Sequence, residues 1–269
     1  MPISIDTDSS SYKYDSFYQM SQDNTIKLNE ILRIDCSNNQ LASLPDNMNF
    51  PKLQIFNCSN NKLKSLPNNM NFPNLECFDC SNNQLASLPV CILNFPNLQR
   101  LICYNNQLKS LPVCILNFHN LQRLICYNNQ LKSLPDNMNF PKLQTFFCSN
   151  NYLTSLPNNM NFPELKEFFC YSNKLESLPV CILNFSNLQY FNCSYNKLSS
   201  LPKDMKFQEL KKFVCSYNQL TSLPDNLKNK DSNFPKLQTF NCSDNQLKSF
   251  LELHTEYYFL PDFYCSYNK

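Results

Sequence analysis

The chain has 269 residues, with 23 Lys and Arg against 21 Asp and Glu and a formal net charge of +2. This near balance argues against a nucleic-acid surface or a polybasic membrane surface, because both need clustered positive charge. The chain contains no glycine, which excludes phosphate-cradling loops, the dinucleotide-binding fingerprint and the nucleophile elbow.

Residues 1–30 are rich in Ser, Asp and Tyr and match no repeat, so we predict a polar lead-in or an N-terminal cap. They carry no apolar segment of a secretory signal, and no run of about 18 apolar residues predicts a transmembrane helix. We therefore expect a cytoplasmic protein without membrane partners, which acts in the host cytoplasm if it is a viral or effector protein. In that compartment the 15 cysteines are expected to stay reduced.

One pattern recurs about eleven times between residues 31 and 269, with the form L-x-x-F-x-C-S-x-N-x-L-x-x-L-P. The alternating apolar residues before its Asn predict a short strand. Because one such unit cannot bury its apolar face alone, neighbouring units must stack, and their strands then form a parallel sheet. The repeated cysteines lie 22 or 23 residues apart, with one spacing of 27, at Cys36, Cys58, Cys80, Cys103, Cys126, Cys148, Cys170, Cys193, Cys215, Cys242 and Cys265.

This pattern resembles the leucine-rich repeat family, whose consensus is L-x-x-L-x-L-x-x-N-x-L. The resemblance covers residues 31–269 and implies an α/β fold, a horseshoe solenoid with a parallel β-sheet on its concave face. The convex side is expected to hold extended and 3-10 turns with little α-helix. The repeat style is similar to that of Ras-group intracellular proteins and bacterial leucine-rich effectors. The Asn-rich, glycine-free composition also resembles that of uncharacterised leucine-rich repeat proteins of amoeba-infecting giant viruses.

The Asn of each repeat stands where the chain leaves the strand and turns inward. A buried side-chain amide there can satisfy backbone groups that the sheet leaves unpaired, and in the family this column is the asparagine ladder. Tight turns in a chain without glycine are expected to use Asn and Asp, which tolerate the left-handed region best. The ladder positions are Asn39, Asn61, Asn83, Asn106, Asn129, Asn151, Asn173, Asn196, Asn218 and Asn245.

The return segments between strands have two lengths. The short form is NNMNF, as at residues 68–72, and the long form is VCILNF, as at residues 90–95. Both are too short and too closely bounded by Pro for a full α-helix. After Leu247 the pattern degrades, and a final incomplete copy reaches Lys269. We predict an uncapped edge strand there and weak self-association through it.

The cysteines of the repeat are expected to pack as small hydrophobic core residues. Cys77 and Cys80 form a C-x-x-C pair, but residues three apart on a strand face opposite sides, so they are not expected to share a metal. Cys91 and Cys114 lie in consecutive long return segments and are expected to be partly exposed, with a redox pair as the less favoured alternative. We predict no cofactor, no metal site and no catalytic residues.

The variable strand positions project from the concave face and carry the binding prediction. The position before the repeat Cys is polar in the first three repeats, apolar in the next four and mixed afterwards, and Tyr replaces the Ser after the Cys in the same zone. Aromatic, aliphatic and Arg side chains together are typical of binding hot spots. The predicted partner-binding residues are Arg100, Ile102, Tyr104, Arg123, Ile125, Tyr127, Phe147, Glu167, Phe169, Tyr171 and Tyr190.

Two plainer explanations of this zone stay open. The residues could serve β-propensity alone, or the zone could reflect a duplication, since residues 99–112 and 122–135 both read QRLICYNNQLKSLP. Duplication leaves Phe147 and Phe169 unexplained.

The resemblance implies a non-catalytic protein–protein interaction module that binds a macromolecular partner through the concave face. The alternative is the substrate-recognition part of a larger, ubiquitin-ligase-like enzyme whose catalytic domain is absent from this chain. A third possibility is a sequence that drifts by duplication and has no specific partner.

Overall fold

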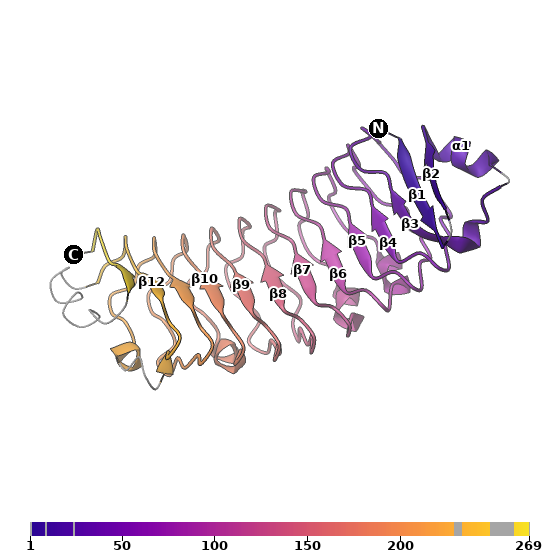
Figure 1. Cartoon of the computed structure of the whole chain (residues 1–269). Coiled ribbons are helices and arrows are strands. Elements are labelled where there is room, and N and C mark those ends of the chain that lie inside the picture. The colour runs from indigo at the N-terminus through magenta and orange to yellow at the C-terminus, as the bar shows by residue number, and fades with distance from the viewer. Residues whose placement is uncertain (1, 9, 24, 229–232, 248–260, 269) are drawn as a thin grey trace. The chain divides into compact units, whose positions relative to one another are not determined.

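The computed structural model describes residues 2–8, 10–23, 25–228, 233–247 and 261–268. The chain divides into two compact units, residues 1–130 and 131–269, and each is a coil of short strands joined by return segments (Figure 1). The degenerate stretch predicted after Leu247 lies outside the described residues from 248 to 260.

Unit 1 consists of the strands and helices β1 (Ile3–Thr7), β2 (Ser11–Tyr14), α1 (Phe17–Gln22), η1 (Leu28–Glu30), β3 (Ile31–Asp35), β4 (Ile55–Asn57), β5 (Cys77–Asp79), η2 (Val90–Asn94), β6 (Arg100–Ile102), η3 (Val113–Asn117) and β7 (Arg123–Ile125), where η marks a 3-10 helix.

Unit 2 consists of β8 (Thr145–Phe147), β9 (Glu167–Phe169), η4 (Val180–Asn184), β10 (Tyr190–Asn192), β11 (Lys212–Val214), η5 (Asp225–Lys228), β12 (Thr239–Asn241) and β13 (Asp262–Tyr264).

The repeat strands β4 to β13 are each three residues long, whereas β3 has five, and within each unit they pair in parallel with the strands of the neighbouring repeats. The register never slips: in unit 1, Phe56 pairs with Phe78 and Phe78 with Leu101. The middle residue of each three-residue strand points into the core, and the first and third point away from it. The predicted parallel-strand solenoid with little helix is therefore confirmed.

Residues 3–14 of unit 1 form an antiparallel hairpin of β1 and β2. The strand β1 also pairs antiparallel with β3, which places Ile5 opposite Ile34, and both side chains are fully buried. The hairpin thus covers the first strand of the repeats. The domain boundary between residues 30 and 31 stays a prediction, although β3 begins at Ile31.

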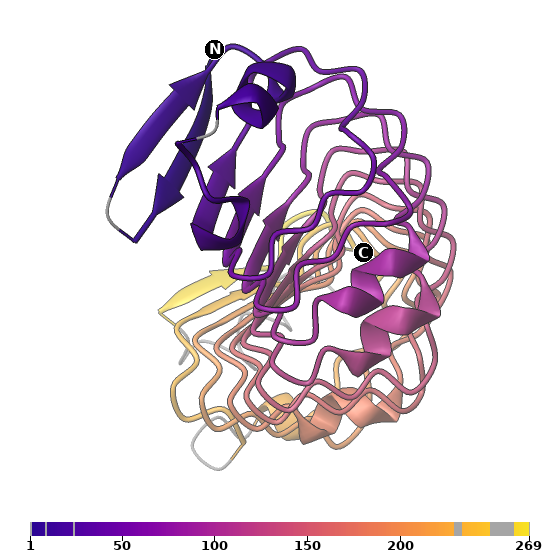
Figure 2. The same cartoon turned by 90° about the vertical axis from the view of Figure 1, so that its right-hand side faces the viewer.

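The long return segments form the 3-10 helices η2, η3 and η4, each entered from an extended proline at 89, 112 or 179. Proline suits this entry because its fixed φ starts a helix and its missing N–H costs no hydrogen bond. In Figure 2 the strands of unit 1 and the helices η2 and η3 lie on opposite sides of the coil. The expectation of 3-10 turns with little α-helix is confirmed.

The short return segments stack by their Asn side chains. The Nδ2 group of Asn69 donates to Asn47 Oδ1 at 2.6 Å, and that of Asn71 donates to Asn49 Oδ1 at 2.9 Å. The same pairing recurs in unit 2, where Asn161 donates to Asn139. Because an amide both donates and accepts, identical Asn residues in register can form a column, which gives the abundance of Asn a structural role.

The core holds columns of phenylalanine and cysteine. In unit 2 the rings of Phe146, Phe168, Phe191 and Phe213 follow one another at 5.5, 5.5 and 5.3 Å between centroids, at nearly parallel angles. Such stacked aromatic pairs add to the energy of apolar burial. The eleven repeat cysteines are all at most 1% exposed, as expected for thiols that act as small core residues.

The asparagine ladder connects neighbouring repeats. Asn106 is typical: its Oδ1 accepts from the backbone N–H of Leu85 at 3.0 Å, and its Nδ2 donates to the carbonyls of Cys80 and Cys103 at 3.0 and 3.2 Å. One side chain thus satisfies backbone groups of two neighbouring repeats, which we also call rungs of the solenoid. Asn61 and Asn83 repeat these contacts in unit 1, and Asn173, Asn196, Asn218 and Asn245 repeat them in unit 2. Asn39, in the first repeat, donates to the carbonyl of Ser37 in its own repeat.

The residue before each ladder Asn has a positive φ, and this position corrects one expectation. Asn fills it in many repeats, for example Asn60 at φ 54° and Asn105 at φ 52°. In unit 2, however, Tyr195 and Tyr217 both adopt φ 53°. The left-handed turn is therefore not confined to Asn and Asp. The ladder Asn one residue later fixes the turn, and its hydrogen bonds hold a bulky residue in a conformation that the residue itself disfavours.

A second set of polar contacts, which we call the brace, stabilises the end of the strand, on the side of the sheet that faces away from the core. Where the third strand residue is Asp or Asn, its Oδ1 accepts from the backbone N–H of the Ser two residues later, and often from the hydroxyl. In unit 2 the Ser194 Oγ donates to Asn192 Oδ1 at 2.7 Å, and in unit 1 the Ser81 Oγ donates to Asp79 Oδ1 at 2.6 Å. This is an Asx turn closed by a serine.

Two carboxylates in this brace have pKa values displaced in opposite directions. Burial raises the pKa of Asp79, and its two bonds from Ser81 only partly oppose that effect. Burial alone would also raise the pKa of Asp35, but hydrogen bonds from Ser37, Arg33 and Asn57 together lower it. The two carboxylates therefore affect stability with opposite sign.

We predict that Asn106→Ala lowers the free energy of unfolding by about 2–4 kcal/mol, because it leaves buried backbone donors and acceptors of two rungs unpaired. Urea unfolding followed by circular dichroism measures the change. Gln107→Ala is the matched control, since the neighbouring Gln107 side chain is exposed; equal stability of the two variants would contradict the role of the ladder.

We predict that the stability of the native chain falls as the pH rises from about 4 through the raised pKa of Asp79, because the folded state holds this proton more tightly than the unfolded state. Asp79→Asn removes the fall and raises stability at neutral pH, while keeping an oxygen for Ser81. Asp35→Asn should do the opposite and lower stability at neutral pH. Unfolding midpoints between pH 3 and pH 8 test both, and a change of the same sign in the two variants would refute the assignment.

We predict that Ser194→Ala costs about 1 kcal/mol of unfolding free energy, because its hydroxyl is bonded to Asn192. Ser149→Ala, at the equivalent position, should cost nothing or stabilise, because Phe147 stands where the acceptor would be and the buried Ser149 Oγ has no hydrogen-bond partner. Parallel urea titrations compare the two variants. A loss of similar size in both would show that the brace does not depend on its acceptor.

Candidate functional site

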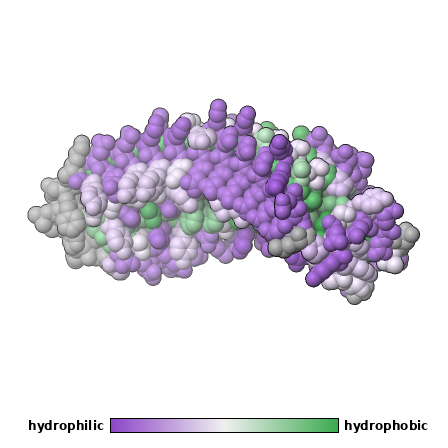
Figure 3. Space-filling view, turned by 90° about the horizontal axis from the view of Figure 1, so that it is seen from above, coloured by the Kyte–Doolittle hydropathy of each residue, from purple (hydrophilic) through white to green (hydrophobic). Residues whose placement is uncertain are grey.

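The candidate site is the outer face of the sheet, which we define as the side chains of the first and third residues of each repeat strand together with the residue after the Cys. These side chains differ in polarity and charge between repeats, whereas the core residues stay apolar. Seen from above the view of Figure 1, hydrophilic residues cover most of the surface, with smaller hydrophobic areas between them (Figure 3).

In unit 1 the structure brings together six predicted residues on β6 and β7, which we call the unit 1 group: Arg100, Ile102, Tyr104, Arg123, Ile125 and Tyr127. The register places Arg100 beside Arg123 and Ile102 beside Ile125. The rings of Tyr104 and Tyr127 stack at 4.5 Å with an interplanar angle of 8°. The Tyr104 hydroxyl accepts a hydrogen bond from Asn82 at 3.4 Å. The group is thus an ordered surface of paired like residues.

The two arginines of this group carry positive charge that the fold leaves uncompensated. Both are exposed, and within the described residues neither makes an ion pair. Arg33, at the same position on β3, differs because Asp35 lies 3.1 Å from it and Asp6 lies 3.9 Å from it. Two unpaired arginines on adjacent strands repel each other, and an acidic group placed over both would relieve that repulsion.

In unit 2 the structure brings together five predicted residues on or next to β8, β9 and β10, which we call the unit 2 group: Phe147, Glu167, Phe169, Tyr171 and Tyr190. The rings of Phe147 and Phe169 stack at 4.5 Å with an interplanar angle of 2°. Both rings are half-buried, and Tyr190 is 36% exposed. Glu167 is half-buried and pairs in register with Tyr190.

The presence of Phe147 deprives the fold of one hydrogen bond, the one that the Ser two residues later makes in other repeats. In rungs such as that of Asn192, the same position holds an Asx residue that braces the following Ser. With Phe147 in place, Ser149 keeps its hydroxyl buried and unpartnered, and a buried polar atom without a hydrogen bond is destabilising. The aromatic pair therefore gives up a structural interaction, which is the pattern expected of a residue retained for binding.

Sequence reasoning missed a second aromatic pair in unit 2. Tyr195 and Tyr217 lie at the left-handed turn position and stack at 4.2 Å, with 52% and 45% of their surface exposed. A hydrogen bond with Tyr195, and then the charge of Asp244, raise the pKa of Tyr217. The signal in the sequence was Tyr in a column where many sister repeats carry Asn.

The cysteines are poor nucleophiles in this fold. Burial raises the pKa of Cys36 to about 12 and also raises the pKa values of nine other repeat thiols, so these thiols stay protonated and unreactive. The expected exposure of Cys91 was wrong: it is buried, and its Sγ donates to the Pro67 carbonyl at 3.2 Å. Cys114 is half-buried.

Within the described ranges, no group of three or more His, Cys, Asp or Glu is placed to hold a metal ion.

The structure also bears on membrane insertion. Among the residues that it describes, no helix has the length and apolar character needed to cross a membrane.

Comparison with known proteins gives one family. A family model described as "Leucine Rich repeats (2 copies)" matches residues 73–117 and again residues 119–159. A search of the curated proteins found no match.

Several solved structures share the fold. YopM from Yersinia pestis, described as a leucine-rich effector protein, is 30% identical with a TM-score of 0.66, over 81% of this chain and 56% of that one. YopM from Yersinia enterocolitica is 27% identical with a TM-score of 0.56, over 86% of this chain and 55% of that one. The functional domain of InlJ from Listeria monocytogenes, whose description includes a cysteine ladder, is 24% identical with a TM-score of 0.67, over 89% of this chain and 54% of that one.

This chain thus spans a little over half the length of the structures to which it is similar. The repeat register, the asparagine ladder, the 3-10 return segments and the family match agree with one another. The chain therefore carries leucine-rich repeats at residues 73–117 and 119–159, and it shares the leucine-rich repeat fold, a protein-interaction scaffold, with these structures.

Proposed function

We propose that this chain is a non-catalytic scaffold that binds a protein partner through the outer face of its sheet. The unit 1 group and the unit 2 group are the proposed contact residues. The observation that carries the proposal is the stacked pair of Phe147 and Phe169, which lies on the solvent side of the sheet and leaves Ser149 unpartnered.

The chemistry of the two groups supports a protein partner. Aromatic and arginine side chains are the residues that contribute most to protein interfaces, because they bury large areas with few rotatable bonds to immobilise. In unit 1, the uncompensated Arg100 and Arg123 favour acidic side chains on the partner. In unit 2, the flat pair of rings favours an apolar contact.

The chemistry of the thiols supports a non-catalytic role. The repeat thiols with raised pKa values are buried and protonated, so they cannot act as nucleophiles in the native state. The YopM structure from Yersinia pestis carries the description of a leucine-rich effector protein, and by that likeness we propose a partner in the cytoplasm of a host cell.

We predict that Phe147→Asn with Phe169→Asn weakens binding at least tenfold and leaves the fold intact or more stable. Asn is the residue that the sheet itself uses at this position, as at Asn192 and Asn241. The partner is first captured from host cytosol by the native chain and identified by mass spectrometry. Its purified form is then titrated against both proteins by calorimetry, and at least a tenfold loss of affinity is expected.

Val214→Asn is the matched control, because Val214 occupies the same strand position in unit 2 outside the group. It should leave the affinity unchanged. A partner that binds the native chain, the double variant and the control with equal affinity would contradict the assignment of this face.

A further inference from the structure

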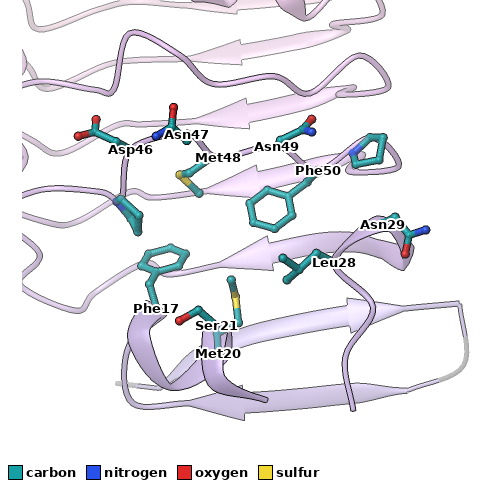
Figure 4. Close-up of a pocket in the computed structure, with 12 residues that line it drawn as sticks. Phe17, Met20, Ser21, Leu28, Asn29, Asp46, Asn47, Met48, Asn49 and Phe50 are labelled. Atoms are coloured by element: carbon teal, nitrogen blue, oxygen red, sulfur yellow. The ribbon is translucent and has the colours of Figure 1, made fainter. Parts of the chain in front are cut away.

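A cleft of about 470 Å³ lies at the first repeat of unit 1, away from the two groups described above (Figure 4). One wall is the first return segment, residues 46–50, which includes Met48 and Phe50. The other wall holds Phe17 and Met20 from α1 and Leu28 from η1. Figure 4 shows the apolar side chains of the two walls directed toward the space between them. Its volume falls within the range of about 300–1,000 Å³ that is typical of ligand pockets.

The cleft exists because the first return segment has a sister segment on one side only. Phe72, in the second return segment, is fully buried between the rings of Phe50 at 5.9 Å and Phe95 at 5.3 Å. Phe50 has the ring of Phe72 on one side and lines the cleft on the other, and only 4% of its surface is exposed. A phenylalanine from a further return segment would complete that stack.

The backbone of the first return segment is also prepared for another neighbour. Asn49 and Asn71 form a parallel bridge, in which Asn71 N–H donates to the Met48 carbonyl at 2.9 Å and Phe50 N–H donates to the Asn71 carbonyl at 3.2 Å. In a parallel pairing the N–H and C=O groups of the intervening residue point to the opposite side. For Asn49 that side is the cleft, and its backbone forms no hydrogen bond with the described residues.

We propose that this cleft binds an extended peptide segment of a partner protein that carries two apolar side chains two residues apart, in the pattern Met-x-Phe. The bound segment adds one more return segment to the column. Its Phe N–H donates to the Asn49 carbonyl, and the Asn49 N–H donates to its Met carbonyl, as the second return segment is bonded to the first. Its Met and Phe side chains fill the apolar space beside Met48 and Phe50.

The occupant is inferred from what covers the same surface elsewhere in unit 1. The partners of Phe72 are return segments of the chain itself: the extended first segment, with Met48 and Phe50 at alternate positions, and the 3-10 segment that ends at Phe95. Leu28 keeps 45% of its surface exposed at the mouth of the cleft, so a bound segment would bury an apolar side chain that now contacts water. This site is independent of the outer face of the sheet.

The probe for the test is the acetylated and amidated peptide Leu-Pro-Asn-Asn-Met-Asn-Phe-Pro, a copy of residues 66–73. It is titrated against the full chain by calorimetry. Two further peptides carry one N-methyl group each, on the Phe or on the Asn that precedes it. We expect saturable binding of the parent peptide, at least tenfold weaker binding with N-methyl-Phe, and little change with N-methyl-Asn, whose N–H faces away from Asn49.

Leu28→Asp in the full chain should lower the affinity for the parent peptide at least tenfold, because it places a charge at the apolar mouth of the cleft. Leu93→Asp is the matched control, since Leu93 is similarly exposed, at 41%, on η2. Absence of peptide binding, equal loss with the two N-methyl peptides, or equal effects of the two Asp variants would each overturn the proposal. So would a dimer, detected by sedimentation, that Leu28→Asp dissociates, because a second copy would then be the occupant.

Discussion

The structure depends on one repeated interaction, the bonding of a buried Asn side chain to backbone groups of two successive rungs. The repeat strands from β4 onward are three residues long and end in a sharp inward turn, so backbone donors and acceptors would be left in the core without a partner. The amide of Asn106 meets both needs, because its oxygen serves Leu85 and its nitrogen serves Cys80 and Cys103. Burial of the Phe and Cys columns is possible only because this turn is satisfied.

The same chemistry lets the chain turn without glycine. Asn residues such as Asn60 accept positive φ at modest cost, and a second set of amides ties the short return segments together through Asn47 and Asn69. A strict register is the condition for all of it, since an amide column forms only between identical residues at the same height. Departures from the repeat, such as Phe147 among the Asx braces, then become visible as losses of specific hydrogen bonds.

The sequence predicted the solenoid because its period is strict, and the buried ladder and the Cys column follow from that period. It did not predict the hairpin of residues 3–14, whose two short strands are set by pairing with β3 rather than by any repeat. It expected Asn and Asp at the left-handed turns, yet Tyr195 sits there because the ladder Asn after it overrides local preference. The buried Cys91 depends on a contact with Pro67, 24 residues away, and the predicted contact residues of the outer face stay a prediction.

The near-identity of residues 99–112 and 122–135 has a consequence for folding. If β5 paired with β7 instead of β6, it would meet the same Arg, Ile and Tyr residues as before. Residues 99–112 and 122–135 therefore carry nothing in their own sequence that fixes which of the two rungs pairs with β5. The information that sets this pairing must come from features that occur once, and the antiparallel pairing of β1 with β3 is such a feature. By pairing with β3, the hairpin fixes which strand comes first in the unit, and the later rungs stack in order from that strand.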